Sequence, residues 1–219
     1  MVSKAKDVQS FFYRYARDFD SIYGNGSKRS LFQKVIAKFF RQTMFLRFRE
    51  TLRNTEKPEI NTVIDIGCGP GHYCVEFLKQ GKTVVGVDVS ANMIKIAEDR
   101  VKQLDLDGKV EFLHSDYLEC KFDYKFDAAN LMGFFDYIKD PKRVLLKLQK
   151  DVRKEVYMSF PKNRGLLSFQ RMIRYKIRKC PLFLYSKKDI FALMHEINLE
   201  DSIEIVDCER DFYVKLNLD

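Results

Sequence analysis

The stretch Thr62-Val-Ile-Asp-Ile-Gly-Cys-Gly-Pro-Gly71 predicts a strand that runs into a glycine-rich turn. Its β-branched start is typical of a buried parallel strand, and a helical pattern follows from His72. Gly67, Gly69 and Gly71 lack a Cβ and tolerate positive φ, so a ligand can lie against their bare backbone. The spacing is G-x-G-x-G, because position 72 is His, and it differs from the G-x-G-x-x-G of dinucleotide-binding folds.

A carboxylate follows the next predicted strand. The apolar segment Thr83-Val-Val-Gly-Val87 ends at Asp88. An acid at the tip of the neighbouring strand can accept hydrogen bonds from ribose hydroxyls. The two segments together predict an adenosine-like ligand; the alternative role of Asp88 is to cap a helix that begins near Ala91.

Strand and helix patterns alternate from residue 62 onward. The predicted strands are 62–66, 83–87, 109–113, 125–131 and 153–160, and the predicted helices are 70–80, 90–103, 141–150 and 186–197. Such alternation requires parallel strands with right-handed crossovers, covered on both faces. The last two strands, about 202–207 and 210–216, are joined by a turn too short for a helix and should pair antiparallel.

This order of segments resembles the class I S-adenosylmethionine-dependent methyltransferases. Three motifs of that family are similar to Asp65–Gly71, Val87–Ser90 and Ser115–Tyr117, and Phe126–Gly133 stands where its fourth strand should be. The likeness covers about residues 60–160 well and 186–219 more loosely. It implies an α/β fold, a Rossmann-like doubly wound seven-stranded sheet with the last strand antiparallel. It also implies S-adenosyl-L-methionine as cofactor and S-adenosyl-L-homocysteine as product.

The resemblance implies a role for each motif at the cofactor. The glycine backbone meets the methionine part, and Asp65 orients the turn or binds the ammonium through water. Asp88 takes the ribose hydroxyls, and Asp116 beside Tyr117 reaches the adenine, unless Asp116 is only an exposed turn acid. The fourth strand ends where the sulfonium meets the acceptor. The implied cofactor-binding residues of the core are Asp65, Gly67, Gly69, Gly71, Asp88, Val89, Asp116, Tyr117, Asn130 and Leu131.

An aromatic run at residues 11–23 is similar to a short N-terminal stretch of small-molecule methyltransferases. In those relatives a tyrosine reaches the cofactor's carboxylate and helps to close the site. Tyr15, and after it Tyr23, is the expected equivalent here. The alternative is that these aromatic residues only pack a helix onto the sheet.

The catalytic candidates lie mainly after the fourth strand. Many relatives carry a histidine there, whereas this sequence has Asp136 and Tyr137. Either could polarise an acceptor hydroxyl, although Tyr137 could equally be a wall of the site. His114 and His195 are further possible bases, with structural roles as the alternative. A base is needed only if the acceptor is a hydroxyl or a protonated amine.

Composition predicts one soluble domain. The 219 residues suffice for a sizeable core, and the odd number of cysteines, five without a C-x-x-C pair, favours reduced thiols and no metal site. The N-terminus lacks the apolar core of a secretory signal, so a cytoplasmic location is expected. The single methyltransferase domain (1–219) divides into an N-terminal helical cap (1–58), a cofactor-binding core (60–160), a basic insert (161–185) and a C-terminal helix and strand pair (186–219).

Positive charge is concentrated in two segments outside the core. Residues 1–61 carry 13 basic and 6 acidic side chains (net +7), residues 160–188 carry 9 and 0 (net +9), and residues 189–219 carry 2 and 9 (net −7). The basic segments stand where relatives hold the acceptor, and the insert has the pattern of an amphipathic basic helix, similar to magnesium-protoporphyrin methyltransferases.

We therefore expect methyl transfer to a small, anionic biosynthetic intermediate: a phosphorylated or nucleotide-linked sugar, or a carboxylated molecule. The alternatives are a solvated lid without an anion site, an RNA methyltransferase or membrane-surface contact through the basic face, and a cofactor-binding scaffold without catalysis.

Overall fold

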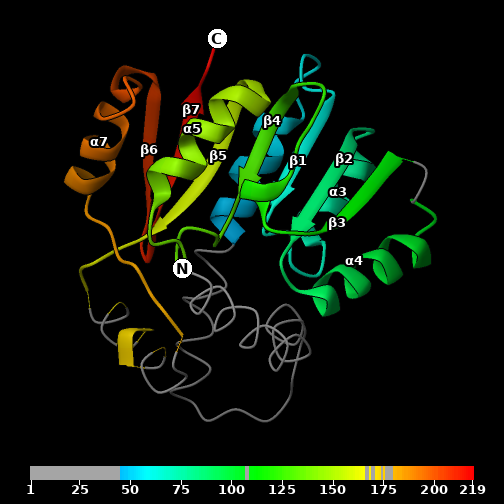
Figure 1. Ribbon diagram of the computed structural model, residues 1–219, viewed down its shortest axis with the longest axis horizontal. Coiled ribbons are helices and arrows are strands. Elements are labelled where there is room, and N and C mark those ends of the chain that lie inside the picture. The colour runs from blue at the N-terminus through cyan, green and yellow to red at the C-terminus, as the bar shows by residue number, and fades with distance from the viewer. Residues whose placement is uncertain (1–44, 107–108, 166–167, 169–170, 174, 176–179) are drawn as a thin grey trace.

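One seven-stranded sheet forms the centre of the molecule. The computed structural model describes residues 45–219 except 107–108, 166–167, 169–170, 174 and 176–179 (Figure 1). The strand order is β3-β2-β1-β4-β5-β7-β6. The strands are β1 (Thr62–Ile66), β2 (Thr83–Asp88), β3 (Val110–His114), β4 (Phe126–Leu131), β5 (Val152–Pro161), β6 (Ile203–Cys208) and β7 (Asp211–Asn217).

The strand order reverses direction at β1, which is the topological switch point of the sheet. β1 pairs in parallel with β2 on one side and with β4 on the other, so the chain reverses its direction of winding between them. β7 pairs antiparallel with both β5 and β6. The doubly wound sheet with an antiparallel last strand is therefore confirmed. In such sheets ligands bind at the carboxyl ends of the strands beside the reversal point, here β1 and β4.

Alternate residues of the strands face two separate cores. Ile64 and Ala129 pack with α5 (Pro141–Asp151) and α7 (Lys187–His195), whereas Val63 and Ala128 pack with α3 (His72–Lys79) and α4 (Ala91–Gln103). The helix at residues 45–55 adds to the second core and lies behind the sheet in Figure 1, with α5 in front. Burial on both faces explains why the parallel strands read as continuous apolar runs.

The expected elements of the core are found within about two residues of their bounds. Between β3 and β4 the chain forms only a short turn of 3₁₀ helix, η2 (Tyr117–Glu119), and a second, η3 (Glu200–Ser202), follows α7. Of the N-terminal helical cap predicted at residues 1–58, only the part from residue 45 lies within the described residues. Among the helices that the structure describes, none has the length and apolar character needed to cross a membrane.

Candidate active site

The turn at residues 67–71, here called the cofactor turn, has the backbone that its glycines allow. The φ angles of Gly67, Gly69 and Gly71 are 70°, 53° and 76°. A Cβ on Gly67 would lie 2.9 Å from Phe134 Cδ2, and one on Gly71 would lie 2.9 Å from Ala97 Cβ. A Cβ on Gly69 would have no atom within 4 Å. The outer two glycines therefore permit close packing, and the middle one presents bare backbone to open space.

Asp88 ties the cofactor turn to the end of β2. Its Oδ2 accepts a hydrogen bond from the backbone N–H of Gly69 (2.9 Å), and its Oδ1 accepts one from that of Ser90 (2.8 Å). Burial raises the pKa of Asp88, and these two bonds oppose the rise. Each oxygen retains a lone pair for a further donor. Asp88 thus sits where a ribose-binding acid should, while it also orders the turn and the approach to α4.

Asp65 is buried at the carboxyl end of β1. Its Oδ1 accepts from Asn130 Nδ2 (2.7 Å) and its Oδ2 from Cys74 Sγ (3.2 Å). Burial raises the pKa of Asp65 to about 6, while these hydrogen bonds lower it. Asn130 Oδ1 is buried without a hydrogen-bond partner among the described residues. The pair therefore retains unused polar capacity next to the cofactor turn.

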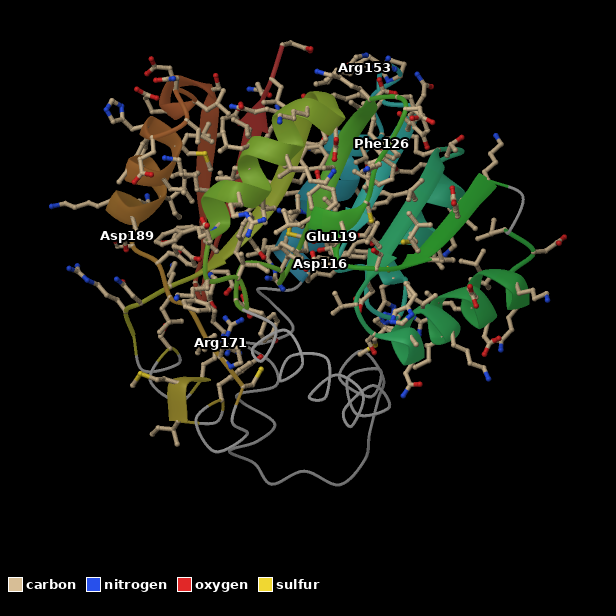
Figure 2. The ribbon with its side chains drawn as sticks, viewed as in Figure 1. Asp116, Glu119, Phe126, Arg153, Arg171 and Asp189 are labelled. Atoms are coloured by element: carbon tan, nitrogen blue, oxygen red, sulfur yellow. The ribbon has the colours of Figure 1, made fainter. Side chains whose placement is uncertain are left out.

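The third motif divides into an exposed and a buried residue. Asp116 is exposed and its Oδ1 accepts from the N–H of Leu118 (2.9 Å). Figure 2 shows Asp116 at the lower edge of the sheet, and Arg171 lies below the same edge. The side chain of Tyr117 is instead buried, and its hydroxyl donates to Asp151 Oδ2 (2.8 Å). The Tyr117 hydroxyl is therefore turned into the core, whereas the Asp116 side chain lies at the surface.

The two candidate histidines lie away from the end of β4. His114 ends the edge strand β3, and its ring Nε2 is 3.2 Å from the carbonyl oxygen of Val89. Two strands separate β3 from β4, which places them about 14 Å apart at the usual spacing. His195 is exposed on α7 and contacts Glu200 Oε1 at 2.6 Å. Both positions disfavour a role as base for an acceptor at β4.

Residues 132–140, here called the β4 loop, contact the basic insert through two polar pairs. Asp136 Oδ2 forms an ion pair with Arg171 Nη2, and the hydroxyl oxygens of Tyr137 and Tyr175 lie 2.9 Å apart. Burial raises the pKa of Asp136, partly offset by Arg171. Burial also raises the pKa of Tyr137 well above its ordinary value. Tyr137 is thus suited to hydrogen bonding and not to accepting a proton.

A buried charge network continues from this ion pair. Arg171 Nη1 lies 2.8 Å from Asp211 Oδ1, and Arg47 Nη1 lies 2.9 Å from Asp211 Oδ2. Arg47 Nη1 also donates to Ser159 Oγ (3.0 Å), which accepts from the Gly133 N–H (2.7 Å).

Sequence reasoning did not identify Arg47, Ser159 or Asp211 as site residues. The one signal for them was that the acidic C-terminal segment has a charge opposite to the two basic segments.

The structure thus gathers most of the implied cofactor residues at one edge. Gly69 of the cofactor turn contacts Asp88, Asp65 contacts Asn130, and Asp116 follows the carboxyl end of β3 at the same edge of the sheet. Val89 follows β2, and Leu131 ends β4 in the core. Tyr15 and Tyr23 lie outside the described residues.

Comparisons with known proteins point to the same chemistry. Residues 63–155 match a family described as a methyltransferase domain. The chain is 25% identical over 240 residues to a demethylmenaquinone methyltransferase of Porphyromonas gingivalis, covering 99% of this chain and 90% of the relative. It is 36% identical over 110 residues to a magnesium-protoporphyrin O-methyltransferase of Rhodobacter capsulatus, covering 49% of this chain. The aligned part spans about half of that relative, 48% of its length.

A solved structure shares the fold over the whole chain. The magnesium protoporphyrin IX methyltransferase from Synechocystis, crystallised with its bound methyl donor, has a TM-score of 0.73 and covers 100% of this chain and 99% of its own. The sequence identity is 16%, so this likeness supports the architecture and not the acceptor.

Proposed function

Because this chain is a class I S-adenosylmethionine-dependent methyltransferase, we propose that it methylates a small anionic acceptor held between the β4 loop and the basic insert. One observation carries the assignment. Gly69 presents open backbone beside β1, and its N–H is bonded to the acid that ends β2. A purely structural turn would need neither the open space nor a partly buried acid on the neighbouring strand.

Each part of the edge has a proposed role toward the cofactor. The cofactor turn approaches its methionine portion, and Asp65 with Asn130 fixes the ammonium. Asp88 accepts from the ribose hydroxyls, and Asp116 lies toward the adenine. The cofactor supplies a methyl group already activated on a sulfonium, so the protein's main task is to place the acceptor in line with it.

Asp136 is our choice among the candidate catalytic residues. It lies on the loop after β4, and its Oδ1 has no hydrogen-bond partner among the described residues. Its raised pKa brings it closer to a useful value for accepting a proton from a hydroxyl. Tyr137 is bonded to Tyr175 and serves as a wall or hydrogen-bond donor, whereas His114 ends β3, which β2 and β1 separate from β4.

Fewer basic side chains support an anionic acceptor than the net charge of the two basic segments indicates, because several of them already pair with carboxylates. Arg47 and Arg171 are neutralised by Asp211 and Asp136, and Lys162 forms an ion pair with Asp207. Arg171 and Lys162 therefore hold the insert to the core, and Arg47 holds the helix at residues 45–55 to it. An anion-binding role falls to the remaining basic side chains of residues 161–185, and the name of the Rhodobacter capsulatus relative supports a carboxylated acceptor.

Methyl-labelled cofactor tests the proposal. The protein is incubated with tritiated S-adenosylmethionine and one acceptor in each reaction. The five acceptors are magnesium-protoporphyrin, demethylmenaquinone, 3,4-dihydroxybenzoate, a nucleotide-linked sugar and bulk transfer RNA. Label in magnesium-protoporphyrin, 3,4-dihydroxybenzoate or the nucleotide-linked sugar supports the proposal. Label only in demethylmenaquinone, which is uncharged, supports methyl transfer to a small molecule but contradicts the anionic acceptor. Label only in RNA, with affinity that falls steeply as salt rises, contradicts it in favour of a nucleic-acid acceptor. Binding of S-adenosylhomocysteine without any transfer indicates a scaffold.

Two glycine variants provide a matched control. Gly69 and Gly81 both have positive φ (53° and 77°), and a Cβ on either would meet no atom within 4 Å. Gly81, however, precedes the start of β2, at the opposite end of that strand from the site. Valine at either position imposes backbone strain, but only Gly69→Val should abolish binding of S-adenosylhomocysteine. Equal loss of binding in both variants would show that strain, not access to the backbone, explains the effect.

A further inference from the structure

Asp211 is the centre of the buried network that surrounds the β4 loop. It is the first residue of β7 and pairs in register with Pro161, the last residue of β5. One carboxylate oxygen contacts Arg47 and the other contacts Arg171. Burial raises the pKa of Asp211, but the two guanidinium groups outweigh this effect and lower it, so the side chain is ionised at neutral pH.

Both arms of the network end on the β4 loop. Through Arg171, Asp211 is connected to Asp136 in the middle of the loop. Through Arg47 and the Ser159 hydroxyl, it is connected to the N–H of Gly133 near the start. The four charged side chains, two cations and two anions, are between 4% and 12% exposed, so water cannot replace a missing partner.

The held loop also packs on the cofactor turn. Phe134, between the two anchored residues, is the side chain that a Cβ on Gly67 would touch. A shift of this loop would therefore change the distance between the acceptor side and the cofactor side of the site. In-line transfer is sensitive to such shifts, since a misplacement of about 1 Å can cost about 100-fold in rate.

We propose that Asp211 is a positioning residue for methyl transfer: it sets the place of the β4 loop, and of Asp136 in particular, through Arg171 and Arg47. The inference rests on the proposed function for its catalytic consequence. The buried network also joins the insert and the helix at residues 45–55 to the core, so their attachment and the placement of Asp136 depend on the same carboxylate.

The test compares four substitutions in the full chain saturated with S-adenosylhomocysteine. Asp211→Asn removes the central charge, and Ser159→Ala removes only the arm to Gly133. Asp207→Asn is the control. Asp207 lies on the edge strand β6 and pairs with Lys162, but its side chain is 55% exposed. Asp211→Glu tests whether a restored charge rescues the first variant. Hydrogen exchange by mass spectrometry follows peptides that contain residues 132–138.

Asp211→Asn and Ser159→Ala should each accelerate exchange of this peptide at least tenfold, with the dissociation constant for S-adenosylhomocysteine within twofold of wild type. Asp207→Asn should change neither. Equal acceleration in peptides of β1 and β5 would overturn the proposal, because it would indicate a general structural role. Unchanged exchange in the loop would overturn it as well, and Ser159→Ala decides the matter if Asp211→Asn does not fold.

Catalysis adds a readout that a structural role would not move. With whichever of the five acceptors above accepts label, Asp211→Asn should lower kcat tenfold or more with little change in the KM for the cofactor. It should also move the acid limb of the pH–rate profile to lower pH, because removal of a neighbouring negative charge lowers the pKa of Asp136. Ser159→Ala should lower kcat without moving that limb. If no acceptor is methylated, the proposed function fails, while the exchange experiment still judges the network.

Discussion

Replacement of Asp65 by asparagine should make the free protein more stable at neutral pH. Asparagine has nearly the same shape, and its side-chain oxygen can still accept from Asn130 Nδ2, the bond that is 2.7 Å long in the structure. What changes is the charge. Burial raises the pKa of Asp65 from 3.8 to about 6, so ionising this carboxyl in the folded state is unfavourable.

The sign of the pH dependence follows from proton binding. Between about pH 4 and pH 6 the folded state holds a proton on Asp65 that the unfolded state has lost, so the folded state loses stability as pH rises through this window. A difference of about 2 pKa units corresponds to about 3 kcal/mol at most. Asp65→Asn should therefore gain about 2–3 kcal/mol relative to wild type between about pH 4 and pH 7.

Urea unfolding of the cofactor-free protein at the two pH values measures this difference. Using the difference between variant and wild type cancels the titration of groups that both proteins share. Asp88 is the main exception, because its charge contributes to the raised pKa of Asp65. A stability difference that is the same at both pH values would refute the reasoning.

Binding extends this prediction to the cofactor. An ammonium group placed beside Asp65 would favour the carboxylate, so S-adenosylhomocysteine should bind more tightly as pH rises through about 6, with release of a proton. Calorimetry in buffers of different ionisation enthalpy detects that proton. Asp65→Asn should bind without releasing it, and proton release that persists in the variant would assign the linkage to another group.

Three further substitutions separate cofactor binding from stability. Asp88→Ala should weaken S-adenosylhomocysteine binding by about 1.5–3 kcal/mol in calorimetry, through lost ribose bonds and an untied Gly69, and unchanged affinity in a folded variant would remove Asp88 from the site. Gly71→Ala should lower the unfolding free energy by about 1–3 kcal/mol in urea, because the new Cβ would crowd Ala97 and because alanine disfavours the positive φ of this position. An unfolding free energy equal to that of the wild type would show that the contact with Ala97 can adjust. Tyr117→Phe should cost about 0.5–1.5 kcal/mol of stability, because it removes one of the two hydrogen bonds that Asp151 Oδ2 accepts while the bond from Lys147 remains, and a loss of cofactor affinity instead would place the hydroxyl in the site.

The local sequence predicted the fold to a large extent because its signals are short-range. The β-branched runs alternate with helical periods, and the glycines that need positive φ stand at the ends of those runs. The antiparallel strand pair followed from a turn too short for a helix. What decides each of these features lies within a few residues of it.

The side-chain roles that the sequence did not predict depend on distant partners. Nothing near Tyr117 indicates that its hydroxyl turns inward to Asp151, which lies 34 residues later. Arg171 reads as a free cation of an amphipathic helix, whereas the structure gives it two buried carboxylates, one of them in the last strand. A count of charges located the opposite segments but could not say that they neutralise one another.

A crystal structure of the complex with S-adenosylhomocysteine tests the central claim most directly. The predicted complex has the amino-acid portion against the cofactor turn, the ribose hydroxyls on Asp88 and the adenine beside Asp116, at the carboxyl ends of β1, β2 and β3. Density for the ligand elsewhere, or a ribose that does not contact Asp88, would contradict this account of the site.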